Sequence, residues 1–177
     1  MSPDIFSVGL EDAVGEIKAH DSRLAKLEAG ISSLLARLDS FKDAMTSFEF
    51  TINSSSYLVS RPIMQNAALA ESSCKLVGGY LLEVNDAYEL QQVKEYLTNE
   101  SVALDVLVGV SDEGDVGKWK FTEHSDLAVF ESVTNIAGAD KGSNCALMMH
   151  DDNWLLRAQP CYRNDVNMLF MCEMPQP

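Results

Sequence analysis

The sequence predicts an α+β domain preceded by a long α-helical coiled coil, and three observations support this fold class. Apolar residues recur with a seven-residue period over residues 10–48. Helix-like and strand-like segments then alternate before giving way to strands alone, and all four cysteines follow residue 70. We expect a coiled-coil oligomerisation helix over residues 4–48 and a domain over residues 49–177, long enough to bury its own core.

The predicted helix carries apolar residues at the a and d positions of its heptads, the pattern of a coiled coil. An isolated helix cannot bury such a stripe, so the chain is expected to form an oligomer. Apolar residues at e positions, Val14 and Leu35, favour three strands over two, although the a/d pattern leaves the number open. The positions expected to mediate oligomerisation are Ile17, His20, Leu24, Leu27, Ile31, Leu34, Leu38 and Phe41.

His20 is the polar exception among the a and d positions. One interpretation is a layer that sets the register or holds water. The other is a layer of imidazoles that become protonated on acidification and loosen the rod. The mass of the oligomer at neutral and at acidic pH distinguishes the two interpretations.

The chain is strongly acidic, with a formal net charge of −14 and a pI of about 4.4. This balance argues against nucleic acids and anionic membranes as partners, because both require clustered Lys and Arg. It permits cationic partners or divalent ions. No apolar run reaches the roughly 18 residues that a transmembrane helix needs, so no membrane insertion is expected.

The first residues resemble a helix start, with Ser2 as N-cap, and not a signal peptide. Four cysteines and two glycosylation sequons, at Asn53 and Asn99, nevertheless suggest a secreted, extracellular glycoprotein. We therefore expect that a leader has been removed from this chain.

After the heptads, turn signals divide the chain into short elements, while residues 122–144 are polar and irregular. The expected order is a β-rich segment at Glu49–Ser60, a helix from Ile63 to Cys74, a strand at Tyr80–Val84, a helix from Asn85 or Asp86 to about Leu97, and strands at Leu104–Val110, Trp119–Phe121, Cys145–Met149 and Met168–Met174. This order is typical of an α+β fold.

Residues 57–173 resemble a C-type lectin-like domain, over about two-thirds of the chain. The residues that carry the resemblance are Cys74, Gly78-Gly79-Tyr80-Leu81-Leu82, Leu107-Val108-Gly109-Val110, Trp119, Cys145, Trp154, Cys161 and Phe170-Met171-Cys172-Glu173. Spacing alone leaves three disulfide pairings open; the resemblance implies Cys74–Cys172 and Cys145–Cys161. The heptads ahead of such a domain are similar to the neck of collectins, which implies a homotrimer.

In this family a sugar site is a calcium ion held by a Glu-Pro-Asn or Gln-Pro-Asp motif, an acid before the third cysteine, and a Trp-Asn-Asp motif. Calcium takes six to eight oxygen ligands. Here the long loop has no such motif, Ser143 replaces the acid, and Leu155 and Leu156 follow Trp154. We therefore expect no cofactor: calcium remains conceivable, but its usual ligands are missing.

Polar residues near the long loop remain as candidates for direct ligand contact. Asp151 and Asp152 either bind a ligand or form a solvated hairpin tip. Leu155-Leu156-Arg157 either forms a contact surface or folds into the core, and Trp119 and Trp154 either stack on a sugar or anchor the core. The candidate ligand-binding residues are Asp140, Asn144, Asp151, Asp152, Trp154 and Arg157.

The sequence gives no reason to expect an enzyme. His124, Ser125 and Asp126 are consecutive, and a catalytic triad needs its base placed between nucleophile and acid. If all cysteines are paired, no thiol nucleophile is left.

The predicted function is multivalent recognition of a glycan or protein ligand by a secreted oligomer, similar to invertebrate humoral C-type lectins of innate immunity. Linked heads raise the effective concentration for a second contact. Two alternatives remain open. One is an acidic structural protein of an extracellular or mineralised matrix, and the other is a subunit of a larger extracellular assembly.

Overall fold

A computed structural model describes residues 5–124, 136–138, 140 and 142–174, with side chains described from Ala13 onward. The chain divides into two compact units, Met1–Ala44 and Met45–Pro177. The second unit is called the head below.

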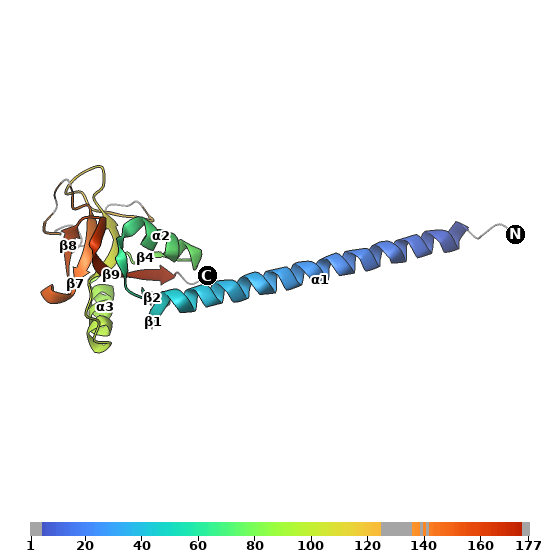
Figure 1. Cartoon of the computed structure of the whole chain (residues 1–177), viewed down its shortest axis with the longest axis horizontal. Helices are drawn as coiled ribbons and strands as arrows, with labels where there is room; N and C mark the ends of the chain where they lie inside the picture. The colour runs from blue at the N-terminus through green and yellow to red at the C-terminus, as the bar shows by residue number, and fades with distance from the viewer. Residues whose placement is uncertain (1–4, 125–135, 139, 141, 175–177) are drawn as a thin grey trace. The chain divides into compact units, whose positions relative to one another are not determined.

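The first unit is one long helix. Helix α1 runs without interruption from Ile5 to Met45 (Figure 1). Nine large apolar side chains of α1 are exposed: Val14, Ile17, Leu24, Leu27, Ile31, Leu34, Leu35, Leu38 and Phe41. All occupy a, d or e positions, so the apolar stripe predicted by the heptads lies on the surface of this helix. Its pairing as a coiled coil stays a prediction.

The prediction that the helix extends to residue 48 is wrong. Strand β1, Thr46–Ile52, follows α1 directly, and its side chains alternate between more and less exposed positions. Phe48 pairs with Val59 of the next strand and therefore is not a d position. Phe50 stacks on Tyr57, with ring centroids 5.1 Å apart. The two-residue period of this segment, not the heptad, decides its structure.

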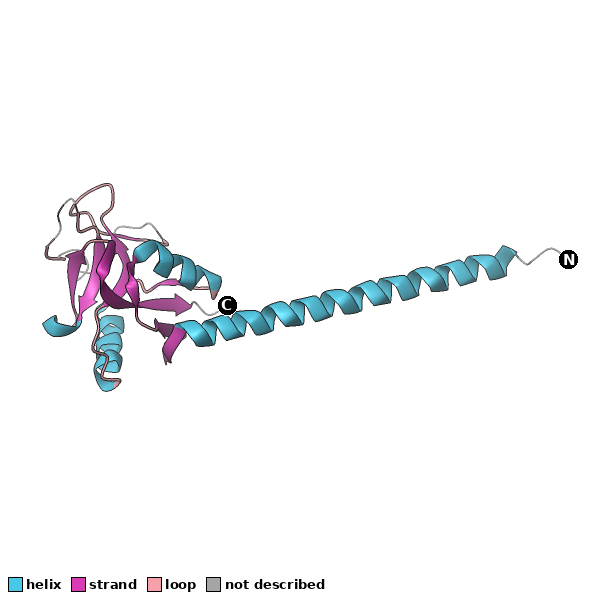
Figure 2. Ribbon diagram, viewed as in Figure 1, coloured by secondary structure: helices cyan, strands magenta, loops and turns pink. Residues whose placement is uncertain are grey.

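The head contains nine described strands and two α-helices (Figure 2). In chain order its elements are β1 Thr46–Ile52, β2 Ser55–Ser60, β3 Ile63–Asn66, α2 Ala67–Leu76, β4 Tyr80–Leu81, α3 Ala87–Asn99, β5 Val106–Ser111, β6 Lys120–Phe121, β7 Cys145–Met149, the 3₁₀ helix η1 His150–Asp152, β8 Leu155–Gln159 and β9 Tyr162–Met174. This is the predicted α+β composition.

Strand β9 connects the two halves of the sheet, whose order is β1-β2-β9-β5-β7-β8. It pairs antiparallel with β2, β3 and β4 and parallel with β5. Strands β5, β7 and β8 then continue antiparallel. Strand β8 is therefore an edge strand beside the turn that carries several of the predicted ligand-binding residues.

Further predicted elements differ from the structure. The strand expected at Tyr80–Val84 covers only Tyr80–Leu81. The expected helix from Ile63 to Cys74 begins only at Ala67, because Ile63–Asn66 pairs with β9 as β3. The Asn66 side chain accepts a hydrogen bond from Leu69 N at 3.0 Å and so caps the helix. The strand expected to begin at Met168 begins six residues earlier, at Tyr162.

The predicted cap of the second helix is confirmed at Asp86. Its Oδ1 accepts a hydrogen bond from Glu89 N at 2.8 Å. The Glu89 side chain in turn accepts one from the N–H of Asn85, the residue before the cap, also at 2.8 Å. Val93 and Leu97 of this helix are fully buried.

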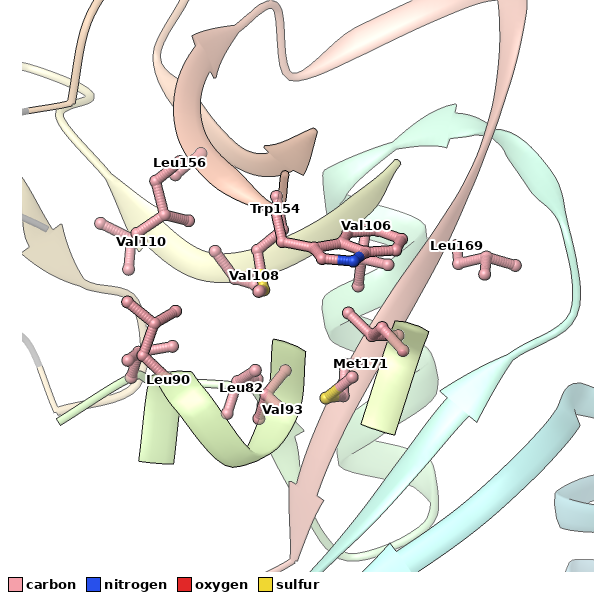
Figure 3. Close-up of a cluster of buried hydrophobic side chains, with 14 of the residues drawn as sticks. Leu82, Leu90, Val93, Val106, Val108, Val110, Trp154, Leu156, Leu169 and Met171 are labelled. Carbon is pink, nitrogen blue, oxygen red and sulfur yellow. The ribbon is translucent and has the colours of Figure 1, made fainter. Parts of the chain in front are cut away.

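The core of the head lies between α3 and the sheet. Figure 3 shows Leu90 and Val93 of α3 facing side chains of β5 such as Val108, with Trp154 beside Val106. A second cluster packs around Cys74, Leu107 and Phe170.

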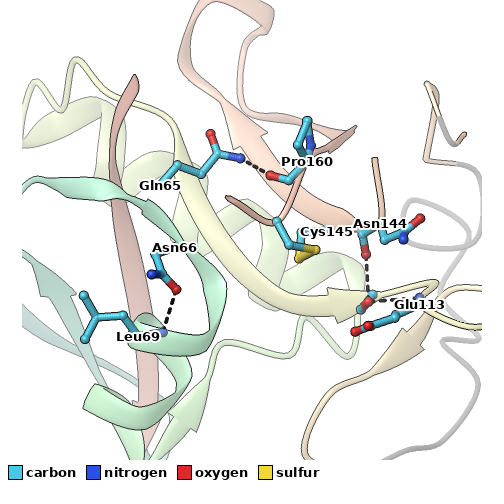
Figure 4. The surroundings of a disulfide bond; sticks show 9 residues. Gln65, Asn66, Leu69, Glu113, Asn144, Cys145 and Pro160 are labelled. Carbon is cyan, nitrogen blue, oxygen red and sulfur yellow. Dashed lines mark hydrogen bonds between the residues drawn. A yellow bond between two sulfur atoms is a disulfide. The ribbon is translucent and has the colours of Figure 1, made fainter. Parts of the chain in front are cut away.

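Both implied disulfides are confirmed, Cys74–Cys172 and Cys145–Cys161. The second lies beside β7, close to the hydrogen bond from Ser111 Oγ to Asn144 O (Figure 4). In the described part of the chain, no helix has the length and apolarity to cross a membrane.

Candidate functional site

The predicted ligand-binding residues fall into two groups. The first precedes β7 and holds Asp140 and Asn144. The second lies on η1, on β8 and in the turn between them, and holds Asp151, Asp152, Trp154 and Arg157. A backbone hydrogen bond from Ala158 N to Ala137 O, 3.0 Å long, ties the long loop to β8. Within the residues that the structure describes, no side-chain hydrogen bond or ion pair joins the two groups.

Asn144 is held by the scaffold. When its amide is oriented to donate, Nδ2 lies 3.2 Å from Asp112 Oδ1 and 3.1 Å from Asp140 O. Asp112 is 1% exposed, and its Oδ2 accepts a hydrogen bond from Gly117 N at 2.6 Å. The Asn144 amide therefore braces the base of the loop. Sequence reasoning missed Asp112, whose signal was an acid two residues after the buried apolar run that ends at Val110.

Asp140 remains exposed next to this brace. Its Oδ1 accepts a hydrogen bond from Gly142 N at 2.8 Å. This backbone hydrogen bond, together with the Ser143 side chain, holds the pKa of the Asp140 carboxyl below its usual value. The carboxylate is therefore ionised at neutral pH and available to a cationic or hydroxyl-bearing ligand.

In the second group, two acids have local partners. Arg157 Nε donates to Asp152 Oδ2 at 2.6 Å. Asp151 Oδ1 lies 2.9 Å from His150 Nδ1, although its side chain is 98% exposed. The Asp152–Arg157 pair bridges η1 and β8 and so shapes the turn.

The alternating faces of strand β8 determine which of its side chains are accessible to a ligand. Leu155 is 44% exposed, whereas Leu156 and Ala158 are 6% exposed, as expected for alternating faces of a strand. Trp154 is 4% exposed, so its ring belongs to the core and its role as a sugar-stacking platform is not supported. Its Nε1 donates to Thr98 Oγ1 at 3.1 Å. Trp119, 3% exposed, is likewise a core side chain.

The residues present do not fit a calcium ion of the usual kind. Leu155 and Leu156 offer no oxygen where the family has its Asn-Asp pair. Asp152 is engaged by Arg157, and the Asn144 amide by Asp112. Among the described residues, no three His, Cys, Asp or Glu side chains lie close enough together to hold a metal ion. That the protein works without calcium stays a prediction.

The remaining predicted sites lie on the surface or outside the described residues. Asn53, in the turn between β1 and β2, and Asn99, the last residue of α3, are both exposed. Their glycosylation stays a prediction. Of the three polar neighbours considered for catalysis, Ser125 and Asp126 lie outside the described residues.

A cluster of buried acids was not predicted. Glu83, Glu89 and Glu173 are 1%, 8% and 5% exposed. Tyr57 Oη donates to Glu89 Oε1 at 2.7 Å, and His124 Nδ1 lies 2.5 Å from Glu83 Oε2. Glu83 also accepts from the backbone N–H of residue 123, so it fastens the start of the long loop. An acid within the apolar run Tyr80–Val84 was the available signal.

Glu173 is the least compensated member of this cluster. Ser55 Oγ donates to its Oε1 at 3.2 Å, but its Oε2 is buried without a hydrogen-bond partner among the described residues. Burial, and then the negative charge of Glu89, raise the pKa of Glu173 to about 7. Burial also raises the pKa of Tyr57 well above its usual value, with the Glu89 hydrogen bond adding to the effect. These acids constitute a buried acidic cluster inside the scaffold.

Comparison with known proteins identifies the family to which the fold of the head belongs. The family model described as "Lectin C-type domain" matches residues 64–174. No curated protein matches the sequence.

Three solved structures illustrate the likeness. The carbohydrate-recognition domain of a mouse scavenger receptor C-type lectin is 17% identical, with a TM-score of 0.59, covering 74% of this chain and 96% of that one. Herring type II antifreeze protein is 17% identical, with a TM-score of 0.60 and coverage of 74% and 98%. Human lithostathine is 13% identical, with a TM-score of 0.59 and coverage of 76% and 93%. At these identities the likeness shows the fold alone. Because the family model covers most of the head, the chain belongs to the C-type lectin domain family.

Proposed function

We propose that this protein is a secreted, oligomeric recognition protein that binds a glycan or protein ligand multivalently, without the usual calcium-dependent sugar site. The observation that carries the proposal is the exposed apolar stripe of α1 in a chain that also holds a C-type lectin head. The stripe supports the assembly of several chains into an oligomer, and the head supports the recognition of a ligand.

Exposure of the apolar stripe to water is energetically unfavourable for a single chain. Ile17, Leu24, Leu27, Ile31 and Leu34 are each between 56% and 64% exposed. Full burial of a Leu or Ile side chain is worth about 1.5–3 kcal/mol. Parallel association of three helices buries the stripe of each one. This gain opposes the repulsion between chains of −14 each, so moderate salt is expected to strengthen the oligomer.

The head supports the calcium-independent part of the proposal. Leu155 and Leu156 lack ligand oxygens, while Asp140 offers an exposed, ionised carboxylate. A single site of this kind binds weakly. Linked copies raise avidity by about 10²- to 10⁴-fold if they engage one surface together, and for this reason the oligomer forms part of the mechanism.

The oligomer is tested by charging the stripe. Leu27→Glu with Leu34→Glu places carboxylates at two d positions and is expected to yield a monomer by sedimentation. The matched control, Ala29→Glu with Ala36→Glu, adds the same charge at exposed f positions of the same helix. A wild-type protein that sediments as a monomer, or a double d-position variant that still assembles, contradicts the proposal.

The ligand class is tested on a glycan array, with calcium and with chelator. Chelator-insensitive binding that weakens at least a hundredfold in the monomeric variant supports multivalent recognition. Binding that requires calcium contradicts the calcium-independent part.

One alternative is favoured by a specific observation. The net charge of −14 suits an acidic structural protein of an extracellular or mineral matrix. Binding to calcium carbonate that disappears at high salt, with silence on the array, favours that function. Silence on both, with capture of a defined protein partner by the assembled chain, favours a subunit of a larger extracellular assembly.

A further inference from the structure

A polar cavity opens between helix α3 and the turn that follows η1. Its volume is about 200 Å³. The residues that line it are Gln91, Lys94, Glu95, Thr98, Asn99, Asn153 and Trp154. Apart from Trp154, none belongs to the predicted ligand-binding residues, and no described residue of the long loop lines the cavity.

Several of these polar groups have no partner within the protein. In the part of the chain that the structure describes, the side chains of Lys94, Asn99 and Asn153 make no hydrogen bond or ion pair. Burial lowers the pKa of the Lys94 amine, consistent with an ammonium group that has lost part of its water. Lys94, Asn99 and Asn153 thus line one cavity while the hydrogen-bonding capacity of their side chains is unused.

The wall contributed by Asn153 is held in place by its neighbours. Asn153 and Trp154 both have left-handed backbone angles, with φ of 52° and 59°. Such angles are uncommon for residues with side chains and rare for a bulky one. Trp154 is fixed by hydrogen bonds from its backbone N–H to Met149 O, 2.9 Å, and from Nε1 to Thr98 Oγ1, 3.1 Å. The turn is therefore rigid, and Asn153 is positioned at the cavity before any ligand arrives.

The side chains that line the cavity indicate which class of ligand it binds. The positive charge of Lys94 and the negative charge of Glu95 cancel, so the cavity has no net charge to attract an ion. The Glu95 oxygens already accept from Gln91, at 2.7 Å, and from Gln92, at 3.3 Å. The net charge of −14 on the chain disfavours anionic ligands. The Thr98 hydroxyl is also engaged, since it donates to Lys94 O and accepts from Trp154 Nε1. The ammonium of Lys94 and the amide of Asn153 remain, and they match a small neutral molecule that both donates and accepts hydrogen bonds.

We propose that this cavity binds one neutral sugar residue through direct hydrogen bonds to Lys94 and Asn153, without a metal ion. The cavity equals the volume of about seven water molecules, which suits a single pyranose ring. The inference deepens the proposed function, on which it rests for its biological role, because it assigns a ligand class and a place on the head.

The test uses the full chain, secreted into a bacterial periplasm so that disulfides form and Asn99 carries no glycan. Saturation-transfer NMR with methyl α-mannoside, methyl β-galactoside and N-acetylglucosamine is recorded in chelator, with glucuronate as the anionic comparison. We expect at least one neutral sugar to bind with Kd near 1 mM. Binding should also change the fluorescence of the protein, because Trp154 lines the cavity.

The informative variant is Lys94→Met with Asn153→Gly, since glycine keeps the left-handed backbone while removing the amide. It is expected to lose at least tenfold in affinity with an unchanged far-ultraviolet circular dichroism spectrum. The matched control is Lys75→Met, which makes the same substitution at an exposed position of α2. This control should bind the sugar as the wild type does. Absence of binding by all three neutral sugars, preference for glucuronate, or unchanged binding by the double variant overturns the inference.

Sedimentation of the same samples separates this result from the proposed function. Sugar binding by a monomeric wild-type protein supports the cavity and contradicts the oligomer. An intact oligomer that binds no sugar contradicts the cavity alone.

Discussion

Helix α1 exposes its large apolar side chains, whereas the head buries most of its own. In α1, Leu27 and Leu34 are 64% and 63% exposed, whereas in the head Leu82 and Leu97 are fully buried. The head also has two disulfides and a polar network inside its core. The difference teaches that the head is complete within one chain, while α1 has the composition of an element that becomes stable only in association.

The largest expected effect that separates the two regions comes from the outer disulfide. Cys74–Cys172 closes a loop of 98 residues, for which chain entropy predicts roughly 4–5 kcal/mol of stability. Cys74→Ala with Cys172→Ala should therefore destabilise the head by that amount and leave assembly through α1 intact. Urea unfolding followed by tryptophan fluorescence reports on the head alone, because both tryptophans, Trp119 and Trp154, lie in it.

The inner disulfide provides a graded control. Cys145–Cys161 closes a loop of 16 residues, and its removal should cost about 3 kcal/mol. Equal losses from the two pairs of substitutions would show that strain or the unfolded state, not loop length, governs the effect.

The next effect concerns pH and Glu173. Its folded pKa of about 7 exceeds the unfolded value of 4.5, so the folded state binds the proton more tightly. Stability from this group is fully present below pH 4.5 and is lost as the pH rises through 7. The difference amounts to roughly 3 kcal/mol, at about 1.4 kcal/mol per pKa unit. Glu173→Gln should therefore stabilise the head at pH 8 and flatten its stability between pH 5 and 8.

Chemical unfolding of the wild type and the variant at several pH values measures this slope. Glu113→Gln, at an exposed acid, is the control and should leave the slope unchanged. A wild-type head that gains stability from pH 5 to pH 8 would refute the assignment to Glu173.

A glycine substitution in the head tests its close packing. A Cβ on Gly109 would lie 2.5 Å from the backbone oxygen of Leu81, so strand β4 must move away. Gly109→Ala should destabilise the head by about 1–3 kcal/mol. Thermal unfolding monitored by tryptophan fluorescence measures the loss of stability. An unchanged midpoint would mean that β4 can move away from residue 109 without a cost in free energy.

The same substitution in α1 should have the opposite sign and the smallest effect. Gly15 occupies an f position, and a Cβ there meets nothing within 4 Å. Gly15→Ala should strengthen the helix by about 1 kcal/mol, measured as a higher melting temperature of the helical signal. A lower melting temperature would place Gly15 in a packed interface and would revise the heptad assignment.

The sequence was sufficient wherever structure depends on near neighbours. The periodicity of residues 10–48 predicted α1, and an acid before an apolar-periodic segment predicted the cap at Asp86. The same local reasoning failed at Phe48, where two patterns overlap and pairing with Val59 decides. Strand β8 was missed because Leu155–Gln159 is short and becomes a strand only by pairing with β7.

The candidate sites depended on contacts between distant parts of the chain. Thr98 and Trp154, which help to form the polar cavity, are 56 residues apart in sequence, and no periodicity brings them together. Glu83 and His124 are 41 residues apart. Residue chemistry identified Asp140 as an accessible carboxylate, but it could not show that the Asn144 amide is occupied by Asp112.

The route by which α1 enters the head has a mechanical consequence. If heads grip a surface while their helices are pulled, the tension enters at Met45 and first reaches the pair Thr46↔Ser60 of β1 and β2. The hydrogen bonds of this hairpin are therefore among the first in the head to bear the load. Extension proceeds up to Cys74, whose covalent link to Cys172 shares the load. Extension as far as Cys74 removes β1, β2, β3 and α2 from the head and releases roughly 90–100 Å of chain as a tether, while the bond to Cys172 keeps the tether attached to the rest of the sheet.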